Sequence, residues 1–315
     1  MMRWEYPQAQ DGYWGEITST IDWCEENYVV SHYVAEWSNT FTNSIFISTA
    51  LYTIYCTRRN KLELRFLLIG LAYCLVGVGS WLFHMTLKYH FQLLDELPMI
   101  YAMCVPCWSL ITELIATFTT GPTKNKHSNG KTNTLSSVKQ VVIASLILLT
   151  ASTVTVVYLI VKNATIHQAF FGCLIGVVAF SSAYMVMTFV KDPQHKKNLH
   201  NSMMMGAIFF MSGYAVWLMD IHLCKLWRFI RREYLLLPLG LLLELHGWWH
   251  VLTGLGIYYY IVCLQYLRLI TTDRLQQYKL IWRWGLLPEL VPADYNIGTP
   301  YSLTFRGPRE KAKPE

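Results

Sequence analysis

Runs of about 20 apolar residues recur along the chain, and they limit the folds that are open to it. Of the 315 residues, 53% are hydrophobic and only 15% are charged, whereas about a quarter of the residues in an average soluble domain are charged. Backbone N–H and C=O groups find no water inside a lipid bilayer, so spans of this length must form helices. The sequence therefore predicts an all-α, multi-pass membrane protein.

Seven spans are expected, at residues 39–56, 66–85, 92–115, 141–161, 169–190, 203–223 and 236–267. Lys and Arg concentrate in the loops after the first, third and fifth spans and in the C-terminal tail, which predicts a luminal N-terminus and a cytosolic C-terminus. The basic loop 224–234 opposes this orientation. We expect a luminal segment at 1–38, a seven-helix bundle at 39–267 and a cytosolic, proline-containing tail at 268–315 with little tertiary structure.

The charge and the two ends of the chain suggest where the protein works. The net charge of +6 is spread over several loops, which indicates membrane topology rather than nucleic-acid binding. The N-terminus lacks the apolar core of a signal peptide. The C-terminal Lys311-Ala-Lys-Pro-Glu315 has the form of a retrieval signal. We therefore expect the endoplasmic reticulum membrane, with the Golgi as the alternative, and infer no obligate protein partner.

Two histidines in the last span, His246 and His250, lie four residues apart. On a helix this spacing places both imidazoles on one face, and His-x-x-x-His is a common way to offer two nitrogens to one zinc ion. An ionisable residue inside a membrane span is costly, which favours a functional role. The alternative is a pair of histidines wetted by lipid headgroups.

The predicted topology places more polar residues at the same depth as this pair. Ser80 and His84 lie near the luminal end of the second span, and Asp95 lies where the third begins. Three histidines with an open fourth position are a ligand set of catalytic zinc. The alternatives are a headgroup-facing His84, a Ser80 that bonds to its own preceding turn, and an Asp95 that stabilises a helix N-terminus together with Glu96.

Two further acids in the span regions have no settled role at this point. Asp220 either orients a ligand histidine or pairs with Lys225, and both alternatives stay open. Glu244 is two residues from His246 and therefore faces another direction, so we assign it no role.

Four segments together resemble one protein family: residues 21–28 (IDWCEENY), 79–87 (GSWLFHMTL), 94–99 (LDELPM) and 246–250 (HGWWH). They resemble the alkaline ceramidases, most closely the fungal ones. These belong to a wider group of seven-span zinc hydrolases and receptors that includes the adiponectin receptors. The resemblance runs from about Trp14 to Trp284. It implies hydrolysis of the amide bond of ceramide (phytoceramide or dihydroceramide), a membrane lipid, to a sphingoid base and a fatty acid.

The resemblance also implies roles for individual residues. It implies zinc ligands at His84, His246 and His250, catalytic roles for Ser80 and Asp95, a calcium site at Asp22, the Trp23 carbonyl, Glu25, Asn27 and Glu36, and a disulfide between Cys24 and Cys224. Calcium prefers six to eight such oxygens, although the acidic segment alone would be interpreted as a solvated loop. Asp95 would move a proton from water to the leaving amine, and Ser80 would donate to the oxyanion.

Two other functions compete with hydrolysis. A zinc-containing receptor of the adiponectin-receptor type, without significant turnover, would share the three histidines. A metal or proton transporter needs polar residues through both leaflets, and the cytosolic halves of the second and seventh spans are apolar.

Overall fold

The computed structural model describes residues 4–120 and 135–310. The lysine pair Lys311 and Lys313 lies outside the described residues. The chain forms two compact units, one made of residues 1–52, 70–99 and 207–257 and the other of residues 53–69, 100–206 and 258–315.

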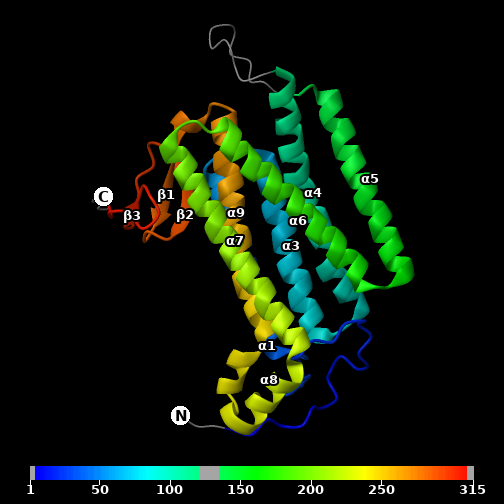
Figure 1. Ribbon diagram of the computed structural model, residues 1–315. Coiled ribbons are helices and arrows are strands. Elements are labelled where there is room, and N and C mark those ends of the chain that lie inside the picture. Colours follow the sequence, from blue (N-terminus) through cyan, green and yellow to red (C-terminus); the bar gives the residue numbers. More distant parts are fainter. Residues whose placement is uncertain (1–3, 121–134, 311–315) are drawn as a thin grey trace. The chain divides into compact units, whose positions relative to one another are not determined.

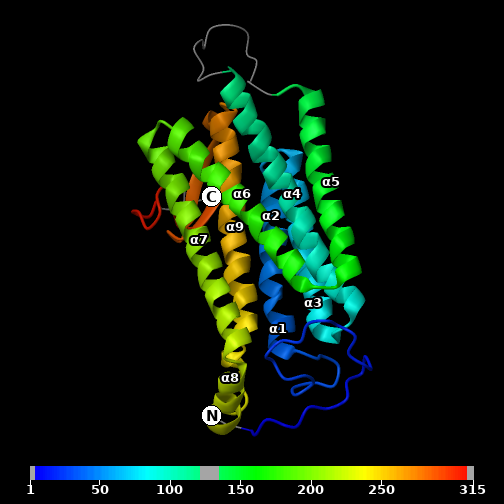
Figure 2. The same cartoon turned by 45° about the vertical axis from the view of Figure 1, so that its right-hand side comes forward.

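Among the described residues, six helices are long and apolar enough to cross a membrane (Figures 1 and 2). They are α3 (Leu64–Thr86), α4 (Tyr89–Thr120), α5 (Ser137–Val161), α6 (Ala164–Phe189), α7 (Pro193–His222) and α9 (Leu245–Thr271). The shortest has 23 residues, and a crossing takes about 20. The prediction of a multi-pass membrane protein is confirmed, and the fold is mostly helical rather than all-α.

The first span, predicted as one helix at residues 39–56, is broken in the structure. It consists of two helices, α1 (Trp37–Thr42) and α2 (Ser44–Arg59), which meet at Asn43. The Asn43 side chain donates to the carbonyl of Asn39 at 2.9 Å, and such local bonds compete with a regular helix. With 16 residues, α2 is shorter than a full crossing. The seventh span and the orientation of the termini stay predictions.

The last predicted span is wrong in its first nine residues. After α8 (Cys224–Ile230), the chain forms a π-helical turn at Arg231–Leu235 and a 3₁₀ turn at Leu239–Leu243. Leu236 has a left-handed φ of 58°, and Pro238 lacks the N–H that an α-helix would use. Helix α9 therefore starts at Leu245, and His246 and His250 lie in its first two turns.

The tail contains a folded sheet, so the expectation of little tertiary structure was wrong and the protein is not purely α-helical. Strands β1 (Tyr278–Arg283), β2 (Leu287–Pro292) and β3 (Tyr301–Ser302) form an antiparallel sheet in the order β2-β1-β3. Prolines are tolerated on an edge strand, and Pro288 and Pro292 lie on the edge strand β2. The buried Glu289 carboxylate pairs with both Arg59 and Arg283.

Candidate metal centre

Three imidazoles converge in the first unit, from His84 near the end of α3 and from His246 and His250 at the start of α9. Their ligand nitrogens lie within 4.8 Å of one another. The ring centroid of His84 is 5.0 Å from that of His246 and 4.9 Å from that of His250. All three side chains are buried. The structure thus brings together the three histidines that the sequence placed at one depth.

Hydrogen bonds fix the orientation of two of these rings. The Glu36 carboxylate bonds Nδ1 of His84, which leaves Nε2 of that ring as the free lone pair. Nδ1 of His250 lies 3.0 Å from the Thr42 hydroxyl. That hydroxyl donates to the carbonyl of Ser38 at 2.7 Å. Because a hydroxyl has one proton, it accepts from Nδ1 of His250 and leaves Nε2 of that ring for a ligand.

The third ring is held by an aromatic contact. The His246 imidazole stacks on the Trp23 indole with 4.0 Å between ring centroids. Nδ1 of His246 and Nε2 of His84 are buried and have no hydrogen-bond partner among the described residues. Buried polar atoms are nearly always partnered, and neutral imidazoles are the form that binds metal. The three side chains therefore fit a metal ion.

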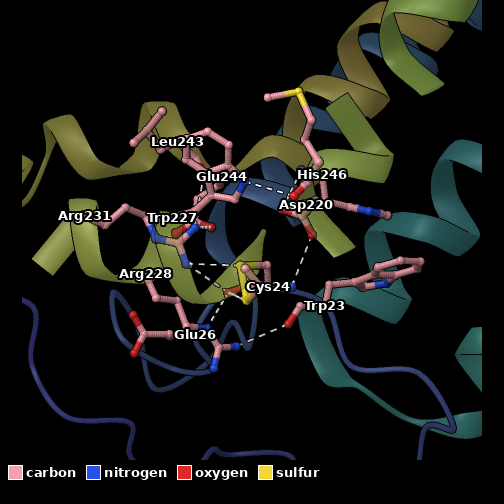
Figure 3. The surroundings of a disulfide bond; sticks show 12 residues. Trp23, Cys24, Glu26, Asp220, Trp227, Arg228, Arg231, Leu243, Glu244 and His246 are labelled. Atoms are coloured by element: carbon pink, nitrogen blue, oxygen red, sulfur yellow. Dashed lines mark hydrogen bonds and ion pairs between the residues drawn. A yellow bond between two sulfur atoms is a disulfide. The ribbon is translucent and has the colours of Figure 1, made fainter. Parts of the chain in front are cut away.

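Asp220, at the end of α7, joins this centre to the N-terminal segment (Figure 3). One carboxylate oxygen accepts from the backbone N–H of His246 and the other from the backbone N–H of Cys24, each at 3.3 Å. Asp220 thus holds the backbone of His246, a candidate ligand. This contact favours a role for Asp220 in orienting a ligand histidine over pairing with Lys225. The disulfide between Cys24 and Cys224 is present, as expected, and ties the same segment to α8.

A buried ion pair beside the disulfide was missed in the sequence (Figure 3). The Arg231 guanidinium is fully buried, pairs with the Glu244 carboxylate and donates to the Cys24 carbonyl at 2.9 Å. Arg228 donates to the same carbonyl, also at 2.9 Å. Glu244 therefore has a structural role, and the basic loop is partly interior. The only signal in the sequence was that loop's conflict with the predicted topology.

Ser80 and Asp95 lie next to a close approach between α3 and α4. A Cβ on Gly79 would lie 2.1 Å from the Leu94 carbonyl oxygen, so this backbone approach requires glycine. The Ser80 hydroxyl lies near enough to the Asp95 carboxyl to interact with it. Ser80 precedes His84 by one turn, about 6 Å along the helix axis. Because α4 begins at Tyr89, Asp95 lies beyond its first turn, which argues against the helix-end alternative.

The acidic N-terminal segment supplies buried oxygens next to the histidines. The Glu25 carboxylate accepts from the backbone N–H groups of Ser38 and Asn39 at 2.7 and 2.8 Å. Burial, and after it the charge of the Glu36 carboxylate, raises the pKa of Glu25. Oδ1 of Asn27 and Oε1 of Glu36 are buried and lack hydrogen-bond partners within the described residues. These oxygens fit a hard cation such as calcium.

The proposed calcium residues are less tightly gathered than the histidines. Asp22 is exposed and accepts from the Asn27 amide at 3.3 Å. The Trp23 carbonyl lies 3.4 Å from an Arg228 nitrogen. Within the described residues, His84, His246 and His250 form the one group of three or more His, Cys, Asp or Glu residues whose ligand atoms lie close enough together to hold a metal ion.

The fold and site define a multi-pass helical membrane protein with a buried three-histidine centre. The family model described as Ceramidase matches residues 15–291. The chain is 54% identical over 309 residues to Alkaline ceramidase YPC1 of Saccharomyces cerevisiae, covering 98% of this chain and 95% of that protein. It is 38% identical over 259 residues to Alkaline ceramidase 3 of Mus musculus, covering 82% and 86%. The chain belongs to the ceramidase family.

Replacing Gly79 with Ala is expected to separate α3 from α4 at Ser80 and Asp95. The added methyl would meet backbone atoms rather than a flexible side chain, and overpacking of this kind typically costs about 1–3 kcal/mol. We expect a lower melting temperature and lower hydrolytic activity. Gly172→Ala is the matched control, because no described heavy atom lies within 4 Å of its added Cβ. Equal melting temperatures for the two variants would contradict the close approach.

Replacing Thr42 with Val is expected to weaken metal binding at the histidines, because Nδ1 of His250 loses its oxygen partner. Loss of such a contact typically costs about 10–100-fold in metal affinity, and zinc titration against a chelator measures it. Thr42→Ser should restore the affinity. Thr153→Val, which removes an exposed helix hydroxyl, should leave it unchanged. Equal affinity in Thr42→Val and the wild-type protein would refute this role.

Proposed function

We propose that the protein is an alkaline ceramidase that hydrolyses the amide bond of phytoceramide or dihydroceramide to a sphingoid base and a free fatty acid. The observation that carries this proposal is the buried three-histidine centre, one helical turn from the contact between Ser80 and Asp95. Membership of the ceramidase family supports it.

In this proposal the three histidines hold zinc and two other side chains move protons and stabilise charge. Zinc held by His84, His246 and His250 would supply a Lewis acid and would lower the pKa of water to about 7. Asp95 accepts a proton from the attacking water and returns it to the leaving amine. Ser80, which lies beside Asp95, donates to the oxyanion that develops on the amide carbonyl.

The six long helices support a multi-pass arrangement in the membrane. We propose that α1 and α2 together form the first of seven spans, with residues 1–38 luminal and residues 268–315 cytosolic. The substrate is then a lipid that reaches the centre from the bilayer. Location in the endoplasmic reticulum, with the Golgi as the alternative, stays a prediction, as does the absence of an obligate protein partner.

A receptor of the adiponectin-receptor type would share the three histidines but would not turn over ceramide. The family match favours the ceramidase. Release of sphingoid base by the purified protein separates the two functions.

The decisive experiment incubates the purified protein with phytoceramide, dihydroceramide and an unsaturated ceramide, and measures the products by mass spectrometry. His84→Ala should lose both bound metal and products. Ser80→Ala should keep the metal, and its rate should fall by about 10²–10³-fold, the usual cost of one oxyanion donor. His200→Ala, at an exposed histidine, should change neither quantity. Absence of sphingoid base from the wild-type protein, or full activity in His84→Ala, would refute the proposal.

We further propose that Asp22, the Trp23 carbonyl, Glu25, Asn27 and Glu36 bind calcium. Chelation of calcium is expected to lower both melting temperature and activity, because the buried carboxylates of Glu25 and Glu36 would lose the cation that offsets their repulsion. Calcium, but not zinc, should restore both quantities. Asn27→Ala should need more calcium, whereas Asn296→Ala, at an exposed tail residue, should not. Unchanged activity and melting temperature after chelation would rule out this site.

A further inference from the structure

The hairpin of β1 and β2 runs back beside α9 instead of away from it (Figures 1 and 2). The Tyr259 hydroxyl donates to the Leu286 carbonyl at 3.0 Å, and the Tyr258 hydroxyl donates to the Pro288 carbonyl at 2.8 Å. Tyr259 precedes the end of α9 at Thr271 by about 18 Å of helix. The turn at residues 284–286 is therefore level with the middle of a helix that can cross a membrane.

The two ends of this hairpin differ in polarity. At the turn, Trp284 and Leu286 are 53% and 44% exposed, and Leu303 on the adjoining segment is 48% exposed. That segment reaches the turn through a bond of 2.8 Å from the Arg306 N–H to the Gly285 carbonyl. The opposite end carries Lys279 and the exposed Asp294. The apolar side chains thus gather at the end that lies level with the middle of α9.

The backbone of the turn is internally bonded, as a lipid environment requires. The N–H groups of Trp284, Gly285 and Leu286 donate to the carbonyls of Pro300, Trp282 and Arg283 at 3.1, 3.0 and 3.0 Å. The carbonyls of Gly285 and Leu286 accept from the Arg306 N–H and the Tyr259 hydroxyl. Five of the six backbone N–H and C=O groups of residues 284–286 thus have partners within the chain, which lowers the cost of placing the turn in lipid.

We propose that this turn, defined as residues 284–286 with Leu303, inserts into the bilayer, in the leaflet in which α9 ends. The ligand is lipid: Leu286, Leu303 and the Trp284 ring contact acyl chains. Arg306 is exposed beside the turn, and its long side chain extends towards lipid phosphates. The tail is then a second contact of the protein with the bilayer, held against α9 by two tyrosine hydroxyls.

Nitroxide labels on the full-length protein in phospholipid nanodiscs test this insertion. The background replaces the accessible thiols of Cys74 and Cys173 with Ala and keeps the disulfide and the four buried free cysteines. Labels are placed at Leu286→Cys, at Leu303→Cys and, as the matched control at the polar end of the hairpin, at Asp294→Cys. Collision rates with oxygen, which concentrates in lipid, and with a water-soluble nickel complex are measured by electron paramagnetic resonance.

The expected result is a ratio of oxygen to nickel collisions that is severalfold higher at positions 286 and 303 than at position 294. Equal ratios at all three positions would place the turn in water and overturn the proposal. Low collision rates with both reagents at position 286 would place the turn against another polypeptide, such as a second copy of the chain, and would also overturn it. The readout does not depend on ceramide hydrolysis, so it stands apart from the proposed activity.

Discussion

The bond between the Glu36 carboxylate and the His84 imidazole connects the N-terminal segment to the candidate metal centre. It does not act alone, because the N–H groups of Ala35 and Glu36 donate to the carbonyls of Met85 and His84 at 2.9 and 3.0 Å. The last carbonyls of a helix have no partner within the helix, and here the N-terminal segment supplies one. The docking that satisfies the end of α3 thus also delivers the carboxylate that orients a candidate ligand.

The surroundings of the centre are rich in buried acids. Glu25, Glu36, Asp220 and Glu244 are all buried, and isolated carboxylates at such positions are costly unless cations compensate them. Arg231 compensates Glu244 directly. The imidazoles add no charge in their neutral, metal-binding form. A cation bound beside the remaining carboxylates would lower the cost of their burial.

The sequence allowed the convergence of the three histidines to be predicted better than the fold around them. Hydropathy revealed the long helices because lipid imposes one pattern on them all, and depth in the membrane placed His84 level with His246 and His250. The break before α9 was missed, since residues 236–244 are as apolar as a helix that crosses a membrane. The tail sheet was missed because its strands are short and Pro288 and Pro292 resemble loop residues. Arg231 and Glu244 pair across this irregular stretch, where no periodicity reports a contact.

The break before α9 has a consequence for the chemistry of the centre. A helix N-terminus carries about half a positive charge and unpaired N–H groups, and α9 begins at Leu245, one residue before a candidate ligand. By itself this end of the helix would oppose a cation. Asp220 accepts from the His246 N–H and places a buried carboxylate at the same point, which offsets the helix charge. The irregular turn and Asp220 therefore act together. The turn places the N-terminus of α9 at the candidate metal centre, and the Asp220 carboxylate makes that helix end compatible with a metal ion.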